Sequence, residues 1–458
     1  MSDAAEVVGA ADGVALEQGA PTPARVLVAY SLPATTASLL FTAIGMYLLK
    51  YSTDVLLIAP AVIGLVFGLS RIVDAVIDPF VGYLSDRTRS RLGRRRPWML
   101  ASALPLGLSY YATWAPPPAL AGDALVVWIT AAIFSFYALT TTFGVPYNAL
   151  GAELSTGYHD RTRVFGARAF ADNLGVVLAA GTIHLLERSA DPRSSAGWLA
   201  GGAAALTVAS IVWPALALRE RADEQRVSSP ASAYRAFADV FVNPHARLLL
   251  AVFFVETLGF QALVSLLPYM TEYVLETPGA TGLYLFGAIG ATLVSIPIWL
   301  PLSRRFGKAR VWTATLFGKG LLFGLLLFVT AGDTALVAFV TVAFGVMSGA
   351  GAVLAPSLQA DVIDTDEVRT GERKEGTFFA AWGLAQKAAV GCSILLSGVV
   401  LDLSGFVPNA VQSERAISGL RLLTSVIPLV LHALAVLMLL RFRLDAVRYA
   451  ELRRGALR

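Results

Sequence analysis

Residues 57–98 read LIAPAVIGLVFGLSRIVDAVIDPFVGYLSDRTRSRLGRRRPW, and this stretch holds the two features that decide the fold. Its first part, residues 57–84, is mainly apolar, and about 20 such residues are enough for an α-helix to cross the hydrocarbon core of a bilayer. The part that follows contains six arginines between positions 87 and 96, and clusters of this kind mark the cytoplasmic side of membrane proteins. The stretch therefore predicts a membrane-spanning helix that ends in a cytoplasmic loop.

The composition of the whole chain also indicates a membrane protein. Of the 458 residues, 56% are hydrophobic and 15% are charged, whereas charged residues make up about 25% of a typical soluble domain. The net charge of +4 does not indicate a nucleic-acid partner, because the arginines lie in short runs between apolar spans and form no separate basic domain. The single cysteine, Cys392, excludes a disulfide within the chain, and the four histidines lack the spacing of metal ligands.

Apolar stretches long enough to span a membrane recur in two groups of six. They cover residues 26–50, 57–84, 97–116, 123–150, 164–187 and 195–218, and then 246–273, 279–303, 311–331, 333–357, 374–402 and 418–441. We therefore expect an all-α membrane protein with twelve transmembrane helices, arranged as an N-terminal bundle over residues 25–218 and a C-terminal bundle over residues 246–441. The remaining segments are expected to be a disordered cytoplasmic tail without a signal peptide (1–24), a cytoplasmic linker with an amphipathic helix (219–245) and a basic cytoplasmic tail (442–458).

The charges of the loops predict the orientation. Lysines and arginines gather after the second and eighth spans and in the C-terminal tail, whereas the loops 115–123, 271–280 and 330–336 contain none. The positive-inside rule then places both termini and the linker in the cytoplasm, as expected for a multi-pass, monomeric protein of the cell membrane that contacts lipid. The motif that follows the second span returns in weaker form as PLSRRFGKARVW after the eighth, which indicates two parallel halves with a solute site between them.

Charged side chains inside the spans are costly and are therefore the first functional candidates. On the second span, Arg71, Asp74 and Asp78 fall at positions i, i+3 and i+7, which puts them on one helical face. Two carboxylates one turn apart favour cation coupling, because desolvation and repulsion help one of them to take a proton, or because both stay ionised and hold a small hard cation. In the alternative interpretation Arg71 neutralises one carboxylate in a structural salt bridge, although the other carboxylate then has no cationic partner.

Further polar residues within the spans are candidates for the solute site. Arg168 and Asp172 lie four residues apart, so they either pair with each other or face the solute. Lys387 has no acidic neighbour in its span and must find a carboxylate on another helix or face a wet cavity. A sugar face requires aromatic rings beside hydrogen-bonding groups, although single aromatic residues also serve packing. The spans contain such groups at Trp382, Tyr147 and Asn148, and isolated polar residues at Glu256, Gln261, Lys319 and Gln386.

Four segments resemble the glycoside–pentoside–hexuronide:cation symporter family of the major facilitator superfamily, of which melibiose permease is the familiar member. They are YLLKYSTDVL at 47–56, the run 70–98, NPHARLLLAVFF at 243–254 and ADVIDTDEVRTGERKEGTFFAAWGLAQK at 360–387. The resemblance implies the major facilitator fold and symport of a sugar or glycoside with H⁺ or Na⁺, without another cofactor. It also implies that Asp74 and Asp78 bind the cation, that Thr141 and Lys387 lie beside them, and that Arg168 lines the sugar cavity.

The chain departs from melibiose permease at the positions of its sugar-binding acids, where it has Ser38 and Gly144, and at a stacking tryptophan, where it has Asn148. A galactoside is therefore not the expected solute. Ile77 precedes Asp78 where sodium users have an amide oxygen, which favours a proton over sodium because sodium needs several oxygen ligands. The expected substrate-binding residues are Arg168, Asn148, Tyr147, Ser38, Asp172 and Trp382.

Charged residues at the cytoplasmic ends of the helices are candidates for conformational gating. Pairs between helices there would hold the outward-facing state; in the alternative interpretation, these residues only set the topology. The residues concerned are Asp86, Arg87, Arg94, Arg304, Arg305 and Arg373.

Three classes of function remain open. The polar residues within the spans favour a cation-coupled symporter of a sugar or glycoside. The loss of both sugar-binding acids keeps open a cation-coupled transporter of a lysolipid or another amphiphilic solute. An enzyme or receptor is disfavoured, because the sequence contains no nucleophile–base pair, metal-ligand spacing, phosphate loop or large extramembrane domain. Spacing alone does not fix the solute, since specificity depends on side-chain geometry.

Overall fold

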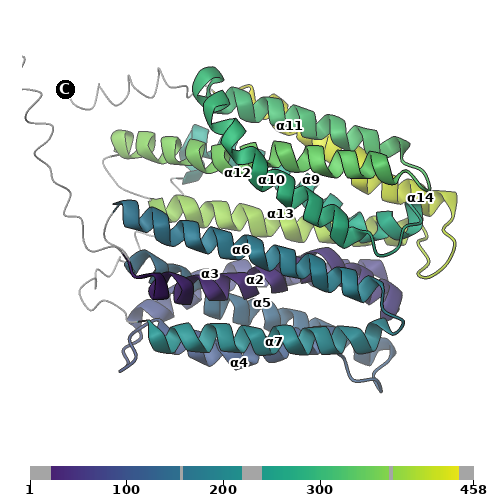
Figure 1. Ribbon diagram of the computed structural model, residues 1–458, viewed down its shortest axis with the longest axis horizontal. Helices are drawn as coiled ribbons and strands as arrows, with labels where there is room; N and C mark the ends of the chain where they lie inside the picture. Colours follow the sequence, from purple (N-terminus) through teal and green to yellow (C-terminus); the bar gives the residue numbers. More distant parts are fainter. Residues whose placement is uncertain (1–21, 155–157, 219–239, 371–374, 443–458) are drawn as a thin grey trace, which may run out of the picture.

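The computed structural model describes residues 22–154, 158–218, 240–370 and 375–442, and all regular structure in these residues is helical (Figure 1). The first part of the chain forms α2 (Ala24–Lys50), α3 (Pro60–Arg87), α4 (Arg96–Trp114), α5 (Gly122–Glu153), α6 (Tyr158–Glu187) and α7 (Pro192–Ala217). The second part forms α9 (Pro244–Tyr269), α10 (Thr281–Phe306), α11 (Lys308–Leu325), α12 (Thr334–Thr370), α13 (Glu375–Leu403), α14 (Glu414–Arg421) and α15 (Ile427–Leu439). Most of the predicted N-terminal tail, linker and C-terminal tail lie outside the described residues.

Eleven membrane spans can be counted among the described residues by length and hydropathy. The predicted span 97–116 is not one of them, although α4 occupies its position as a helix of 19 residues. Its hydropathy is reduced by polar residues that α4 buries, among them Ser102, Ser109 and Thr113. Each of these hydroxyls donates a hydrogen bond to a backbone carbonyl of the preceding turn, which satisfies it within the helix.

Several helices differ from the predicted spans at their ends. α12 continues to Thr370, well beyond the predicted end at 357. The last predicted span, 418–441, is divided into α14 and α15 by a π-helical turn at Leu422–Val426. Such a turn changes the hydrogen-bonding pattern of a helix from i→i+4 to i→i+5 and leaves its apolar character unchanged, so hydropathy alone does not predict it.

The helices form two packed groups that follow the order of the chain (Figure 1). In the first half, α2 packs against α6 and α7, and α4 packs against α5 and α7. In the second half, α9 packs against α13 and α15, and α12 packs against α10 and α11. The halves meet where α3 contacts α13, α6 contacts α10 and α2 contacts α9. We call the end at which α2 begins and α15 ends the near end, and the opposite end, where α14 lies, the far end.

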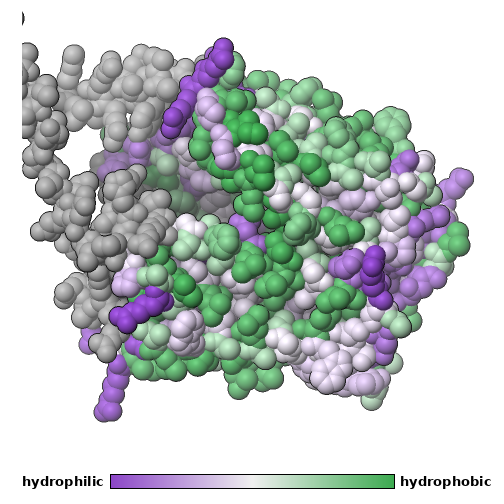
Figure 2. Space-filling view, viewed as in Figure 1, coloured by the Kyte–Doolittle hydropathy of each residue, from purple (hydrophilic) through white to green (hydrophobic). Residues whose placement is uncertain are grey.

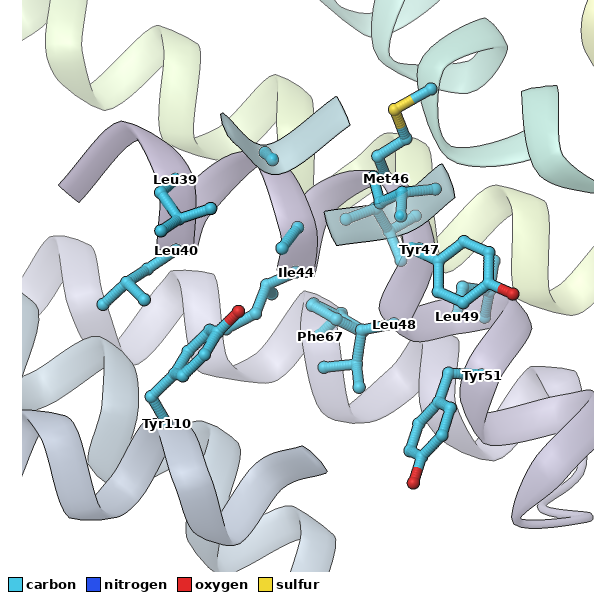
Figure 3. Packing of buried hydrophobic residues seen from close by; sticks show 14 of the residues in the cluster. Leu39, Leu40, Ile44, Met46, Tyr47, Leu48, Leu49, Tyr51, Phe67 and Tyr110 are labelled. Carbon is cyan, nitrogen blue, oxygen red and sulfur yellow. The ribbon is translucent and has the colours of Figure 1, made fainter. Parts of the chain in front are cut away.

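Apolar side chains cover both the surface and the interior. Figure 2 shows mainly apolar residues over the middle of the visible face and polar residues towards the two ends, as expected for a protein surrounded by lipid. Inside the first half, Leu40, Ile44 and Leu48 of α2 are buried together with Phe67 of α3 and Tyr110 of α4 (Figure 3). This packing fixes α2 in the middle of the half, from where it also reaches α9.

Candidate functional site

The four residues expected at a cation site come together halfway along their helices. Lys387 Nζ of α13 lies 2.6 Å from Asp78 Oδ2 and 3.1 Å from Asp74 Oδ2, both on α3. The Thr141 hydroxyl of α5 donates to Asp78 Oδ1 at 3.1 Å and also contacts Asp74 Oδ1. We call these four residues the midplane cluster. The isolated lysine predicted to need a carboxylate therefore finds two, on a helix of the other half.

Arg71 adds a second cation to the midplane cluster. Its Nη1 lies 3.6 Å from Asp74 Oδ2, and its guanidinium stacks 4.0 Å from the ring of Tyr137. The Asp74 side chain is only 4% exposed, whereas Asp78 is 36% and Lys387 is 25% exposed. Asp74 is thus held by Arg71 and Lys387 in a dry environment, and Asp78 is the carboxylate that solvent reaches. Pairing with Arg71 alone would leave one of the two carboxylates without a partner, and Lys387 neutralises that carboxylate.

Four of the six expected substrate-binding residues form one group in the first half. Ser38 of α2 donates to Asp172 Oδ1 of α6 at 3.0 Å, and Arg168 Nε lies 3.8 Å from Asp172 Oδ2. The Arg168 guanidinium lies 5.0 Å from the centre of the Tyr147 ring, and its Nη1 donates to the Tyr30 hydroxyl at 3.3 Å. Arg168 and Asp172 therefore pair with each other and also remain partly exposed, at 25% and 40%.

The two other expected residues lie outside this group. Asn148 is exposed on α5, next to the buried Tyr147. Trp382 belongs to α13 in the second half, and its ring centre lies 5.1 Å from that of Phe253 on α9.

A group that sequence reasoning missed joins the two halves at the far end. Lys50 Nζ lies 2.8 Å from Asp54 Oδ2 and 2.7 Å from Glu272 Oε2 of the other half. The Tyr273 hydroxyl donates to Asp54 Oδ2 at 2.6 Å, and the hydroxyls of Thr53 and Tyr269 lie 2.8 Å apart. We call these six residues the far-end cluster. Asn409, in the loop after α13, closes it by donating to the backbone oxygen of Asp54 at 2.6 Å.

The two contributions to the far-end cluster are copies of one local structure. α2 continues into a π-helical turn at Tyr51–Val55, and α9 continues into one at Met270–Val274, 219 positions later. Leu56 N donates to Tyr51 O in the first turn, and Leu275 N donates to Met270 O in the second. Leu57 and Glu276, again 219 positions apart, both have φ of 56°, which is uncommon for residues other than glycine.

This repeat makes the far-end cluster approximately symmetric. Positions 219 apart are equivalent, so Lys50 corresponds to Tyr269, Thr53 to Glu272 and Asp54 to Tyr273. The Lys50–Glu272 pair and the Thr53–Tyr269 pair are then counterparts, and Asp54 meets its own equivalent, Tyr273. Such a self-complementary contact is the mark of a two-fold axis, which here passes between the two halves. The shared Val-Leu at 55–56 and 274–275 is a weak sequence signal of it, as are the identical Phe41 and Phe260 earlier in the two helices.

The expected gating residues that the structure describes lie at the near end. Arg304 and Arg305 are exposed at the end of α10, and Arg87 stacks on Tyr83 of its own helix at 4.0 Å. Lys308 forms an ion pair with Asp361 within the second half at 2.6 Å. Arg94 is half-buried before α4, whereas Arg373 and the side chain of Asp86 lie outside the described part of the chain.

Comparison with known proteins identifies the family. Residues 29–446 match the family model of MFS/sugar transport proteins. The chain is 25% identical to the isoprimeverose transporter of Lactiplantibacillus pentosus, over 91% of this chain and 88% of that protein. It is 27% identical to the sodium-dependent lysophosphatidylcholine symporter 1-A of Danio rerio, over 89% of this chain and 83% of that protein.

The fold is shared with solved transporters. The crystal structure of a D-xylose-proton symporter superimposes with a TM-score of 0.69 at 14% identity, covering 91% of this chain and 98% of the other. The match of the family model covers nearly the whole chain, including both halves and every residue of the midplane cluster. The protein is therefore a multi-pass membrane transporter that belongs to the MFS/sugar transport protein family.

Proposed function

We propose that the protein is a secondary active transporter that carries a sugar or glycoside together with H⁺ or Na⁺ by alternating access. The observation that carries this proposal is the position of Lys387, which links two carboxylates of one half to a helix of the other. An ion pair across the moving interface ties the occupancy of the carboxylates to the relative position of the halves. The symporters among the relatives support a coupling cation in this protein as well.

In the coupling step the incoming cation replaces Lys387 as the partner of Asp78. A proton that binds to Asp78 removes its charge and so releases the ammonium group 2.6 Å away. A sodium ion would instead use the oxygens of Asp74, Asp78 and Thr141, and it would have to displace the ammonium from between them. In both cases Lys387 balances the charge of Asp78 while the site is empty, and the cation takes its place when the site is loaded.

The proposed topology is twelve spans in two six-helix halves, with both termini and the basic near end in the cytoplasm. α4 is the twelfth span, because its polar residues are buried against α5 and α7 rather than exposed to lipid. The far end is then the outer end, and the far-end cluster is the gate that closes it. The basic residues of the near end, among them Arg87, Arg94, Arg304 and Arg305, would close the opposite end in the outward-facing state; Asp86 and Arg373 are proposed to take part on sequence grounds alone.

The proposed solute site lies between the halves and is lined by the group around Arg168. Its partly exposed carboxylate and guanidinium can both hydrogen-bond hydroxyl groups. Ser38 contacts Asp172, Tyr147 lies beside Arg168, and the exposed Asn148 follows Tyr147 on α5. On the opposite half, Trp382 offers a ring for a sugar face. A sugar-transporting relative of similar length supports this class of solute.

A second candidate solute is a lysolipid. A lysophosphatidylcholine symporter is among the relatives, and α6 presents a row of exposed apolar residues, Phe170, Leu174 and Leu178, on a different face from Arg168 and Asp172. A head group would meet Arg168 and Asp172, and the acyl chain would pass around α6 to the apolar row.

The test measures external pH in de-energised, lightly buffered cells that express the protein, while melibiose, isoprimeverose, D-xylose or D-glucuronate is added. We expect one of these sugars to cause an alkaline shift, or a sodium-dependent uptake without such a shift. Asp78→Asn should abolish either signal, because an amide neither takes a proton nor balances a sodium ion. Asp402→Asn, the same change at an exposed position, should leave the signal intact.

The contrary result is equally informative. If none of the four sugars causes a proton or sodium movement, but labelled lysophosphatidylcholine enters in an Asp78-dependent manner, the lysolipid is the solute. If Asp78→Asn transports normally, the midplane cluster is a structural salt bridge and the proposed coupling is wrong.

A further inference from the structure

Three polar side chains of the second half converge on Gly351, in the middle of α12. The Cβ atom that Gly351 lacks would lie 3.7 Å from Glu256 Oε1, 3.7 Å from Trp312 Nε1 and 3.8 Å from Lys319 Nζ. These are the three atoms nearest to that position, apart from the adjoining residues and backbone of α12. Glu256 comes from α9, and the two others come from α11, so three helices surround one small polar space.

The groups around this space have hydrogen-bonding capacity left over. Lys319 Nζ contacts Glu256 Oε1 at 2.7 Å, and this pair uses one of the three donors of the ammonium group. Trp312 is fully buried, and within the described residues its Nε1 has no hydrogen-bond partner. Burying an indole N–H without an acceptor is unfavourable, so the space beside Gly351 lacks a group that can accept from it.

The chemistry of the three side chains determines which group can occupy the space beside Gly351. It must accept hydrogen bonds from Trp312 and Lys319 and donate one to Glu256. A hydroxyl does both, since it has one donor and two acceptor lone pairs. A carboxylate or phosphate would be repelled by Glu256, and an ammonium group would be repelled by Lys319.

Aromatic rings flank the space on both sides along α9. Phe253 and Phe260 lie one turn before and one turn after Glu256, on the same helical face. Phe253 contacts Trp382, and Phe260 stacks on Phe344 with ring centres 5.4 Å apart. Glu256 is 13% exposed and Phe260 is 40% exposed, so the space opens on the α9 side. Apolar rings beside a hydrogen-bonding group suit the C–H face of a sugar.

We propose that Glu256, Trp312, Lys319 and Gly351 form a hydroxyl-binding subsite in the second half, which takes one hydroxyl of the transported sugar. The subsite rests on the proposed function and deepens it. Arg168 and Asp172 contact the sugar from the first half, and the subsite selects a hydroxyl at one ring position from the second. Because the contacts come from both halves, the sugar itself would hold them together during transport.

Two substitutions at Gly351 test the subsite without disturbing the packing. A Cβ there meets its nearest neighbours at ordinary contact distance, so both Gly351→Ala and Gly351→Ser can fold. The alanine methyl fills the space, and the serine supplies a hydroxyl of its own. Gly290→Ala on α10, where an added Cβ meets nothing within 4 Å, is the matched control.

Transport is measured by counterflow in proteoliposomes with melibiose, isoprimeverose, D-xylose and D-glucuronate, and with the monodeoxy derivatives of whichever sugar is exchanged. In wild type, we expect one monodeoxy derivative to have an apparent affinity about 10- to 100-fold lower than that of the parent sugar, because it lacks one hydrogen bond to a charged group. For the parent sugar, both Gly351 variants should have an apparent affinity lower than that of wild type by a similar factor. For that derivative, their apparent affinity should equal that of wild type. Gly290→Ala should behave as wild type does.

Two results of this assay would count against the subsite, and a third would count against the proposed function. If the loss for every monodeoxy derivative is the same in wild type and in the Gly351 variants, no sugar hydroxyl binds there. If only Gly351→Ala is impaired, and Gly351→Ser matches wild type with every sugar, the space holds a water molecule only. If wild type exchanges none of the four sugars, the proposed solute class fails. The indole N–H resonance of Trp312, assigned with Trp312→Phe, then decides separately: a saturable shift with any of the sugars supports the subsite, and no shift overturns it.

Discussion

The midplane cluster and the far-end cluster both join the two halves through ion pairs, but they are built differently. In the midplane cluster both carboxylates belong to the first half and the ammonium group to the second, and Asp78 and Lys387 are 36% and 25% exposed. In the far-end cluster Lys50, 5% exposed, pairs with the 4% exposed Asp54 of its own half and with the 33% exposed Glu272 of the other half. Lys387 and Asp78 are thus both accessible to a cation from solvent, whereas Lys50 is buried on its own half and reaches across to the other. The comparison teaches that one lysine paired with two carboxylates can differ in how deeply the lysine is buried and in which half holds the carboxylates.

The largest effect is expected from Lys387→Met. Without the ammonium group, the empty midplane cluster carries an unbalanced negative charge, and such a charge in the membrane centre costs about 2.5–3.5 kcal/mol, or about 100-fold in rate. Net uptake down a cation gradient should therefore fall by about 100-fold, because the empty carrier no longer returns. Counterflow should persist, because the carrier that is loaded with cation and solute stays neutral. Parallel assays of net uptake and counterflow in the same proteoliposomes check this.

Counterflow is also the control for folding in that experiment. A variant that loses both activities would show that Lys387 maintains the structure or the solute site. A variant that keeps both would show that the midplane cluster needs no neutralising cation, and the contrast with the far-end cluster would then disappear.

A smaller effect is expected from Glu272→Gln in the far-end cluster. The substitution removes one charge-assisted contact to Lys50, and a bond of this kind contributes about 1.5 kcal/mol at a partly exposed site, or about tenfold in an equilibrium. The far end should therefore open about tenfold more often. The measurement is the rate at which a membrane-impermeant maleimide labels Gly45→Cys in a Cys392→Ser background. Gly45 is suitable because Gln261 of α9 donates to its backbone oxygen across the interface at 3.1 Å.

Lys308→Met is the matched control for the gate. It breaks the 2.6 Å pair with Asp361, which lies at the near end and within one half. Labelling at position 45 should not change in this variant. Equal labelling rates for Glu272→Gln and wild type would mean that the far-end cluster does not hold the halves together.

The smallest effect is expected from Tyr269→Phe. This removes the neutral hydrogen bond to Thr53, which is the symmetric counterpart of the charged Lys50–Glu272 pair. A neutral bond contributes about 1 kcal/mol, so labelling of Gly45→Cys should rise about fivefold, less than for Glu272→Gln. Tyr51→Phe loses a similar bond, to Trp114 O at 2.7 Å within the first half, and should have no effect. A larger effect of Tyr269→Phe than of Glu272→Gln would contradict the view that charge sets the strength of the gate.

Most of the fold could be predicted from the sequence, because apolar length alone determines where helices can cross a bilayer. α4 shows the limit of hydropathy: its position was predicted, yet its buried hydroxyls lower its apolar character below that of the other spans. The π-helical turns after α2 and α9 could not be predicted, since they change the hydrogen-bonding pattern of a helix and leave its apolar character unchanged.

The candidate site was predictable only where charges stand out against an apolar background. Asp74, Asp78 and Lys387 were found because charges in the middle of spans are rare. Lys50 and Glu272 were missed because charged residues at the ends of spans are ordinary, and only the folded structure brings them together. Glu256 and Lys319 were noted singly, but their pairing depends on the register between α9 and α11, which hydropathy does not contain.

The meeting of Asp54 with Tyr273 also bears on how the two halves relate to separate chains. In a dimer of identical subunits, a residue on the symmetry axis must face a copy of itself. Two aspartates there would repel each other, and two tyrosines would leave Lys50 without the carboxylate of its own half, which lies 2.8 Å away. Joining both halves in one polypeptide removes this constraint, because each side of the axis can carry a different residue. The 2.6 Å bond from the Tyr273 hydroxyl to Asp54 is thus a contact that two identical subunits could not make across their axis.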